Sequence, residues 1–154
     1  TYNSEKTLKR TINSLLYQNF SNFEYILIDG SSSDTTIEII KSYEVAFKKR
    51  NINYTWISEK DSGIYDAFNK GIRLAKGDWI SFLGSDDYYL EEALELYNNQ
   101  IEKQSIDLDF IHSIVKVENN KVIRDKWEWK HFRKAMNIAH VGAFHNKNYF
   151  KKYG

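Results

Sequence analysis

Three groups of acidic side chains follow apolar, strand-like stretches of this sequence. Asp29 ends the stretch FEYILID, Glu59 and Asp61 follow INYTWIS, and Asp86 and Asp87 follow GDWISFL. Carboxylates at strand ends can accept hydrogen bonds from a ligand or hold a cation. The adjacent pair Asp86 and Asp87 is unfavourable unless a cation or a polar ligand lies between the two charges. The simpler alternative is a solvated loop in which Asp87 caps the next helix.

The spacing of apolar residues predicts the elements that would position these carboxylates. Apolar residues recur at intervals of three and four in four stretches, which favours amphipathic helices. These helices begin after Ser4 and after Ser33 or Asp34, and they cover about 64–75 and 90–103. Short apolar runs bounded by polar or glycine residues are typical of buried strands. Such runs cover residues 23–29, 52–58 and 77–83.

Helices and strands alternate through residue 103, which is typical of βαβ units in a mostly parallel α/β sheet flanked by helices. After about residue 108 the pattern changes to strand-like stretches around an Asn-Asn turn, which predicts an antiparallel extension. The segment from His140 to Gly154 is expected to form a strand and then a helix. In open α/β sheets, ligands bind beyond the carboxyl ends of the strands. The three acidic groups therefore predict a ligand site at one edge of the sheet.

The composition excludes several classes of protein. The chain has 154 residues, 42% hydrophobic and 16% aromatic, which suits one folded domain rather than a disordered segment. Its net charge of +1 provides no general attraction for nucleic acid or anionic lipid. The absence of cysteine excludes disulfides and thiolate metal sites and fits a reducing compartment. No apolar run reaches the ~20 residues needed to cross a bilayer, and no signal-peptide pattern is present.

Four segments of the chain resemble family 2 glycosyltransferases of GT-A fold, in the order and spacing of that family. They are TYN, YILIDGSSSDTT, EKDSGIYDAFNKGIRLAKGDWISFLGSDDYY and HVGAFHNKNYFKKYG. The resemblance covers nearly the whole chain and is strongest to the bacterial branch that builds capsular, exopolysaccharide and lipopolysaccharide glycans. It implies a GT-A, Rossmann-like fold, with residues 1–154 forming a single nucleotide-sugar-binding domain.

The resemblance also implies residues that bind the donor. Tyr2 occupies the position of an aromatic that packs near the nucleotide base, and Asp29 that of the carboxylate that contacts the base. Asp61, Asn69 and His140 are further candidate donor contacts. Each has a structural alternative: Asp29 can bond the backbone of its own turn, Asn69 can satisfy local backbone groups, and His140 can be a structural histidine beside a strand.

The segment Ser85–Asp87 corresponds to the DXD motif of the family. By this resemblance, Asp86 contacts the ribose, and Asp87, with Asp86 beside it, ligates Mg²⁺ or Mn²⁺ on the donor diphosphate. Hard oxygen ligands suit these cations. A cation there stabilises the charge that develops on the departing nucleoside diphosphate.

The chain also departs from the family pattern. Many members have an ARN-like sequence where this chain has Asp66 to Asn69. The acidic motif that supplies the catalytic base does not occur between Asp125 and Gly154, so we expect the base beyond Gly154. The first strand of the family is not found before its TYN segment here. We therefore expect the domain to be partial, with its first strand and its catalytic-base region outside residues 1–154.

The resemblance predicts an enzyme that transfers a sugar from a nucleotide-sugar donor, a UDP-sugar, to a glycan or lipid-linked acceptor. The reaction is expected to be inverting and metal-dependent, with a hexosyl or N-acetylhexosaminyl group transferred. The expected location is the cytoplasm, at the inner face of the cell membrane, with peripheral membrane association through segments outside this chain. No nucleic-acid partner is expected, and the sequence carries no signal for an oligomeric state.

Two other functions remain open from the residues alone. One is a non-catalytic domain that binds a nucleotide sugar or a glycan. The other is a sugar-phosphate nucleotidylyltransferase, although TYNSEKTLKR does not resemble the glycine-rich phosphate loop of that class. The aromatic cluster Trp127, Trp129, His131 and Phe132 is interpreted as an acceptor platform or as core.

Overall fold

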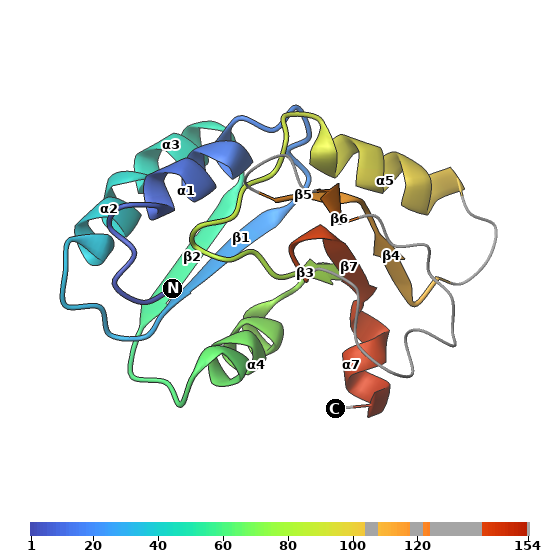
Figure 1. The fold of residues 1–154 in the computed structure, drawn as a ribbon. Helices are drawn as coiled ribbons and strands as arrows, with labels where there is room; N and C mark the ends of the chain where they lie inside the picture. Colours follow the sequence, from blue (N-terminus) through green and yellow to red (C-terminus); the bar gives the residue numbers. More distant parts are fainter. Residues whose placement is uncertain (104–107, 118–121, 124–139, 154) are drawn as a thin grey trace. The chain divides into compact units, whose positions relative to one another are not determined.

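The computed structural model describes residues 1–103, 108–117, 122–123 and 140–153 (Figure 1). They form two compact units, which we describe separately. Unit 1 comprises Thr1–Gly77 and Gly84–Ser105, and unit 2 comprises Asp78–Leu83 and Ile106–Gly154.

Unit 1 is built on a pair of parallel strands, β1 (Glu24–Asp29) and β2 (Asn53–Ser58). Their register places Tyr25 beside Tyr54 and Asp29 beside Ser58. The connection between them contains the two helices α2 (Thr36–Ser42) and α3 (Glu44–Lys49). A parallel pair needs such a crossover because the chain must return to the same end of the sheet.

The two faces of this strand pair are covered by different helices (Figure 1). On one face the fully buried Phe47 of α3 stacks on Tyr54, with ring centroids 4.6 Å apart, and lies 5.7 Å from Tyr25. On the other face Gly71 of α4 (Ile64–Leu74) lies beside Ile28. Tyr25 and Ile28 point to opposite faces because side chains alternate along a strand. The sheet of unit 1 therefore has helices on both faces, as the alternation of elements predicts.

Helix α1 (Leu8–Leu16) confirms its predicted apolar face, since four of its apolar residues are buried. These are Leu8, Ile12, Leu15 and Leu16. One predicted helix start changes and another is retained. The side chain of Ser4 does not cap α1 but lies 2.8 Å from the hydroxyl of Ser85. Asp34, one of the two predicted caps of the second helix, accepts from the backbone N–H of Thr36 at 3.0 Å.

Two other boundaries also differ from the expectation. The helix predicted over about 33–47 is divided at Tyr43 into α2 and α3. Helix α5 (Ala93–Lys103) begins well after the predicted Leu90, so Asp87 is not its N-cap. The simpler interpretation of Asp87 as a capping residue is therefore wrong.

Unit 2 contains a three-stranded antiparallel sheet in the order β3-β7-β4. The strands are β3 (Trp79–Ser81), β7 (Ala143–Asn146) and β4 (Phe110–His112). A 3₁₀ turn, η2 (His140–Gly142), precedes β7, and α7 (Lys147–Tyr153) follows it. A short antiparallel pair, β5 (Val115–Lys116) and β6 (Val122–Ile123), completes the unit. The antiparallel extension and the final strand and helix are confirmed.

The parallel sheet is smaller than predicted. Among the described residues, β1 and β2 form a parallel pair, whereas β3 pairs with β7 in the antiparallel direction. Alternation of helices and strands indicates crossovers, but it does not specify which strand lies next to which. The expectation of an α/β fold is confirmed, and the expectation that β3 continues a mostly parallel sheet is corrected.

The contacts of His145 with three phenylalanine rings predict that the core of unit 2 is sensitive to acid. His145 lies within ring contact of Phe82, Phe110 and Phe150, at centroid distances of 6.2, 4.9 and 5.6 Å. Burial, and then the charge of His140, lowers the pKa of His145 below 6.5. Between this lowered pKa and 6.5 the unfolded chain binds more protons than the folded one, so stability falls as the pH decreases through that range.

We expect His145→Gln to reduce the loss of melting temperature between about pH 7.5 and about pH 5.5, because the variant removes the titrating ring. Thermal unfolding followed by near-UV circular dichroism at several pH values measures this loss. An unchanged pH profile in the variant would show that other groups dominate the acid response.

Candidate functional site

The acidic turn Gly84–Asp87 brings two carboxylates to one point. The turn is closed by a hydrogen bond from the backbone N–H of Asp87 to the carbonyl of Gly84, at 3.1 Å. A Cβ placed on Gly84 would lie 2.7 Å from Oδ2 of Asp87 and 3.0 Å from Oδ1 of Asp86. Both carboxylates therefore lie over the backbone of Gly84, in space that any other residue would fill.

The electrostatics of this turn favour a cation. Asp86 is exposed and Asp87 is partly buried. Burial, and then the negative charge of Asp86, raises the pKa of Asp87, whereas a hydrogen bond from the Gly84 backbone and the charge of Arg10 act in the opposite direction. A divalent cation beside both carboxylates would remove their mutual repulsion.

The pair alone does not complete a coordination shell. Within the described ranges there is no group of three or more histidine, cysteine or acidic side chains that could hold a metal. This fits a cation such as Mg²⁺, which keeps several waters and is commonly bound by one or two carboxylates together with substrate phosphates. The residues present therefore fit a metal-diphosphate better than a closed structural metal site.

Asp29 is fully buried, and its carboxylate is bonded by its own chain. It accepts hydrogen bonds from the backbone N–H of Ser32 at 3.0 Å, from the hydroxyl of Ser32 at 2.5 Å and from the hydroxyl of Ser58 at 2.7 Å. This is the arrangement expected of a residue that shapes a turn. These bonds are those of the structural alternative, and a nucleotide base could reach the carboxylate only if the turn moved, because Asp29 is fully buried.

The carboxylate of Asp61 lies against the turn that follows Asp29. A Cβ on Gly30 would be 2.8 Å from Oδ2 of Asp61, so Gly30 leaves space for this carboxylate. The other oxygen, Oδ1, accepts from the backbone N–H of Gly63 at 3.0 Å. The structure thus brings together two of the three predicted strand ends, those of β1 and β2.

The segment around Tyr2 joins the same region. The backbone of Thr1 bonds β1 on both sides of Asp29: its nitrogen donates to the carbonyl of Ile28 at 2.6 Å, and its carbonyl accepts from Gly30 at 2.9 Å. Two residues later the backbone N–H of Asn3 donates to the hydroxyl of Ser32 at 2.8 Å. Tyr2, between these anchored residues, is 63% exposed. Its ring is therefore available to a ligand at this edge.

Ser4 links this segment directly to the acidic turn. The hydroxyl of Ser4 lies 2.8 Å from the hydroxyl of Ser85. The segment Thr1–Ser4 thus bonds the turn after β1 at one end and the acidic turn at the other. Tyr2, Asp61, Asp86 and Asp87 consequently belong to one connected region of unit 1, which we call the acidic edge.

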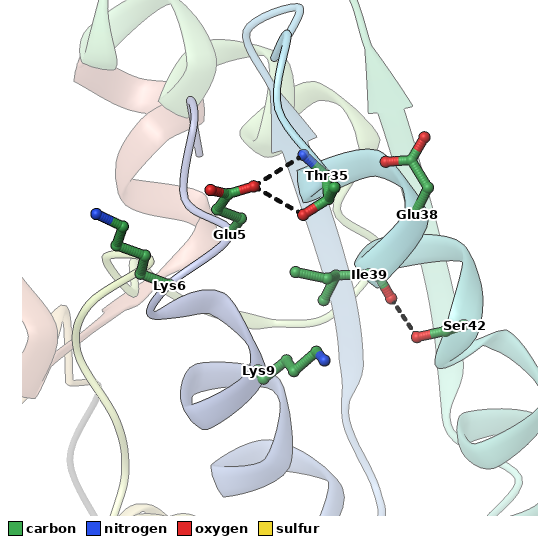
Figure 2. A pocket seen from close by; sticks show the side chains of 7 residues that line it. All are labelled: Glu5, Lys6, Lys9, Thr35, Glu38, Ile39 and Ser42. Carbon is green, nitrogen blue, oxygen red and sulfur yellow. Dashed lines mark hydrogen bonds between the residues drawn. The ribbon is translucent and has the colours of Figure 1, made fainter.

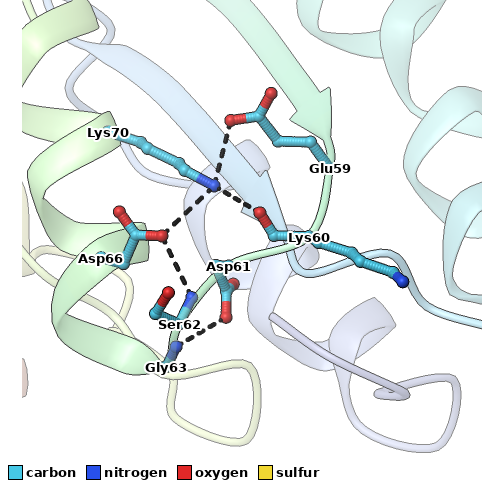
Figure 3. Close-up of polar contacts among 7 residues, drawn as sticks. All are labelled: Glu59, Lys60, Asp61, Ser62, Gly63, Asp66 and Lys70. Carbon is cyan, nitrogen blue, oxygen red and sulfur yellow. Dashed lines mark hydrogen bonds and ion pairs between the residues drawn. The ribbon is translucent and has the colours of Figure 1, made fainter.

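The loop that carries Asp61 is held by a lysine on α4 (Figure 3). The ammonium group of Lys70 lies 3.0 Å from Glu59 and 3.5 Å from Asp66, and it donates to the carbonyl of Lys60 at 2.8 Å. Asp66 also accepts from the backbone N–H of Ser62 at 3.1 Å. The hydrogen bond to Glu59 raises the pKa of Lys70, and that from Ser62, followed by the charge of Lys70, lowers the pKa of Asp66.

Sequence reasoning missed Lys70 as a functional candidate, although a signal was present. Asp66 and Lys70 are four residues apart on a predicted helix, a spacing that favours an ion pair. The contacts of Lys70 with residues 59 and 60 had no such signal, because they depend on where the loop folds.

The remaining predicted site residues are not joined to the acidic edge by the contacts above, or they lie outside the described residues. Asn69 is exposed on α4. His140 is exposed at the start of η2, in unit 2. The aromatic residues at 127, 129, 131 and 132 lie outside the described residues.

An open pocket of about 500 Å³ lies between α1 and α2 (Figure 2). On one side Glu5 accepts from the backbone N–H and the hydroxyl of Thr35, at 3.2 and 2.8 Å. The lining residues are Glu5, Lys6, Lys9, Thr35, Glu38, Ile39 and Ser42. None of these is a predicted donor or metal residue, so the pocket is separate from the acidic edge.

Comparison with protein families identifies the chain. Residues 1–150 match the model of glycosyl transferase family 2. The chain belongs to this family. The predicted resemblance is confirmed at this level, and a nucleotidylyltransferase is no longer supported.

Curated relatives of this family 2 chain include two kinds of bacterial glycosyltransferase. A PGL/p-HBAD biosynthesis glycosyltransferase of Mycobacterium bovis is 36% identical over 91 residues, which is 59% of this chain and 34% of that protein. The poly(ribitol-phosphate) beta-N-acetylglucosaminyltransferase TarS of Staphylococcus aureus is 33% identical over 97 residues, which is 62% of this chain and 16% of TarS. The chain thus spans about a third or less of the length of these relatives.

Solved glycosyltransferases share the fold. TarS 1–349 of S. aureus in complex with UDP-GlcNAc matches 99% of this chain and 45% of its own, with a TM-score of 0.69 and 20% identity. The mannosyltransferase PcManGT of Pyrobaculum calidifontis, in complex with GDP-Man and Mn²⁺, matches 100% of this chain and 44% of its own, with a TM-score of 0.75 and 16% identity. These scores confirm the α/β glycosyltransferase fold. Among the described residues, no helix is long and apolar enough to cross a membrane.

The contacts of Lys70 predict that it orders the loop of Asp61. Lys70→Met removes the charge but keeps a long side chain, so residues 59 and 60 lose their bonds to α4 while the bond between Ser62 and Asp66 remains. We expect their backbone amides to exchange with deuterium a few-fold faster, and this difference to shrink at high salt because the link is ionic. Hydrogen exchange with mass spectrometry measures the effect.

Lys60→Met is the matched control. It removes the same charge from the loop itself, but the ammonium group of Lys60 points away from the cluster (Figure 3). Equal exchange in the two variants would mean that Lys70 does not order the loop.

Proposed function

We propose that this family 2 chain is the nucleotide-sugar-binding part of a metal-dependent glycosyltransferase. The donor is a UDP-sugar, and the acceptor is a glycan or a lipid-linked sugar of the bacterial cell envelope. The observation that carries the proposal is the convergence of Asp86 and Asp87 over Gly84, since this creates a paired-carboxylate site within a chain of this family. The names of the relatives, which include an N-acetylglucosaminyltransferase, agree with this donor class.

Asp86 and Asp87 are the residues that would hold Mg²⁺ or Mn²⁺. When bound, the cation stabilises the negative charge that develops on the nucleoside diphosphate as it leaves. Asp86, the more exposed of the two, is also free to accept a hydrogen bond from the ribose. The complex of PcManGT with Mn²⁺ supports a metal in this fold.

The remaining residues of the acidic edge bind the nucleoside in this proposal. Tyr2 offers an exposed ring on which a base can stack. Asp61 offers a carboxylate that can accept a ring N–H of uracil. Asn69, which is not part of the acidic edge, is a further donor contact, and a donor-binding role of His140 stays a prediction. Asp29 bonds the base if the turn moves to expose its carboxylate, and otherwise it supports the turn on which the base rests.

In the proposed transfer, an acceptor hydroxyl attacks the anomeric carbon as the bond to the diphosphate breaks, which inverts the configuration. The proton of that hydroxyl passes to a carboxylate base, and we assign no residue of this chain to that role. The expected cytoplasmic location at the membrane stays a prediction.

Removal of one carboxylate tests the metal site. We expect Asp87→Asn in the full-length protein to lower the rate of sugar transfer about 100-fold or more, because metal stabilisation of a leaving group contributes several kcal/mol. The melting temperature should change little, since the carboxylate lies at a turn. Release of UDP from a panel of UDP-sugars, with and without Mn²⁺, measures the rate.

Glu95→Gln on the exposed side of α5 removes the same charge away from the turn and serves as the control. Transfer by Asp87→Asn at the rate of this control would contradict the metal assignment. A wild-type protein that binds UDP but releases none from any donor would instead favour the non-catalytic binding domain.

The position of the nucleotide can be tested independently of transfer. We expect addition of UDP and Mg²⁺ to perturb the NMR signals of the acidic edge, with the largest changes at Tyr2, Asp61 and Asp87. The opposite end of the strands, at Lys48 to Asn51, should be unaffected. Perturbations confined to Lys48–Asn51 would contradict the proposal, because the nucleotide would then bind at the opposite edge of the sheet.

A further inference from the structure

The acidic turn is fixed to α1 through its main chain. The hydroxyl of Thr11 lies 2.9 Å from the carbonyl oxygen of Ser85 and 2.7 Å from that of Asp87. Between them, the carbonyl of Asp86 accepts from Nη2 of Arg10 at 2.9 Å. Three consecutive carbonyls are therefore held by two neighbouring residues of one helix.

Thr11 is buried, with 1% of its surface exposed. A hydroxyl has one hydrogen to donate, so the two carbonyls share it in a three-centre bond. Buried carbonyls that lose their donor are costly to keep in place. The hydroxyl thus sets the spacing of the carbonyls of Ser85 and Asp87, and with it the turn that carries both carboxylates.

Arg10 adds to this fixation from the exposed side. Its guanidinium carbon lies 4.6 Å from the ring centre of Tyr88, the residue after the turn. The side chain therefore contacts the turn at Asp86 and the chain just after the turn at Tyr88. Arg10 is exposed, so its bond to Asp86 should contribute less than that of Thr11.

Within the proposed function, we infer that Thr11, supported by Arg10, is a positioning residue for the metal carboxylates. Thr11 touches neither ligand nor metal, and it acts through the backbone of the turn. Because Asp86 and Asp87 must both lie over Gly84 to meet one cation, a shift of the turn separates them. Partners that orient metal ligands commonly change metal affinity 10–100-fold when they are removed.

Thr11→Val tests this role because valine keeps the shape of threonine and removes the hydroxyl. We expect the affinity for Mn²⁺, titrated calorimetrically into the full-length protein in the presence of UDP, to fall about 10-fold. In the metal-free protein the amides of residues 85–89 should exchange with deuterium faster. Thr11→Ser, which restores the hydroxyl, should recover both properties.

Tyr54→Phe is the matched control. The hydroxyl of Tyr54 donates to the backbone carbonyl of Ile40 at 3.2 Å, so the variant also loses a hydroxyl that bonds a main-chain carbonyl, but neither residue belongs to the turn. It should lower the melting temperature as much as Thr11→Val but leave the affinity for Mn²⁺ unchanged. Arg10→Met changes an exposed side chain, so this variant should fold even if Thr11→Val does not. It should weaken Mn²⁺ binding less than Thr11→Val does.

The outcomes separate the two proposals. Wild-type affinity for Mn²⁺ and wild-type exchange in both Thr11→Val and Arg10→Met, with normal binding by the wild-type protein, overturn the role of Thr11 alone. Equal loss of Mn²⁺ affinity in Tyr54→Phe also overturns it, because the effect would then be general destabilisation. A wild-type protein that binds neither UDP nor Mn²⁺ overturns the proposed function and this inference together.

Discussion

The hydrogen bonds from α1 to the chain between β3 and α5 are the constraint on which the acidic edge depends. This stretch has irregular backbone, so its polar groups need partners from elsewhere. Besides the bonds of Thr11, the hydroxyl of Ser14 accepts from Tyr89 at 3.2 Å. The buried Gln18 bonds both the carbonyl of Leu90, at 2.8 Å, and the backbone N–H of Leu94, at 3.0 Å. Helix α1 and Gln18, two residues beyond its end, therefore hold the chain from Asp86 and Asp87 to the start of α5, while the apolar face of α1 packs into the core.

The two carboxylate-bearing loops of the acidic edge are held by different kinds of interaction, neutral hydrogen bonds in one and ion pairs in the other. The turn of Asp86 and Asp87 is fixed largely by neutral hydrogen bonds from partly or fully buried groups, which salt screens little. The loop of Asp61 is tied to α4 by Lys70, whose partners Glu59 and Asp66 are more exposed, and such pairs weaken with ionic strength. The loop of Asp61 should thus respond to salt more than the turn of Asp86 and Asp87. This difference gives the two halves separate experimental signatures, although they lie in one unit.

The local features of unit 1 could be predicted from the sequence, whereas its long-range bonds could not. The spacing of Leu8, Ile12 and Leu15 predicts α1 because helical periodicity is a property of neighbouring residues. The bond between Ser4 and Ser85 joins positions far apart in the chain, so the same serine resembles a helix cap in the sequence and becomes a tether in the fold. Likewise, the alternation of elements predicts β3, but its antiparallel pairing with β7 depends on residues that come more than sixty positions later. The strand-end carboxylates were predictable as a group because chain direction places the ends of β1 and β2 at one edge. The residues that position these carboxylates could not be predicted from the sequence.

Gly30 and Gly84 show a shared reason for glycine at this edge. Each follows a strand or strand-like stretch, and a Cβ at either position would lie within 2.8 Å of a carboxylate oxygen, of Asp61 at Gly30 and of Asp87 at Gly84. Among the described glycines, a positive φ is found at Gly63, so the requirement at these two positions is for space and not for backbone conformation. An alanine at Gly30 or Gly84 could adopt the backbone but would push a carboxylate away from the main chain. The absence of a side chain at Gly30 and at Gly84 therefore leaves space for a carboxylate in both carboxylate-bearing loops of the acidic edge.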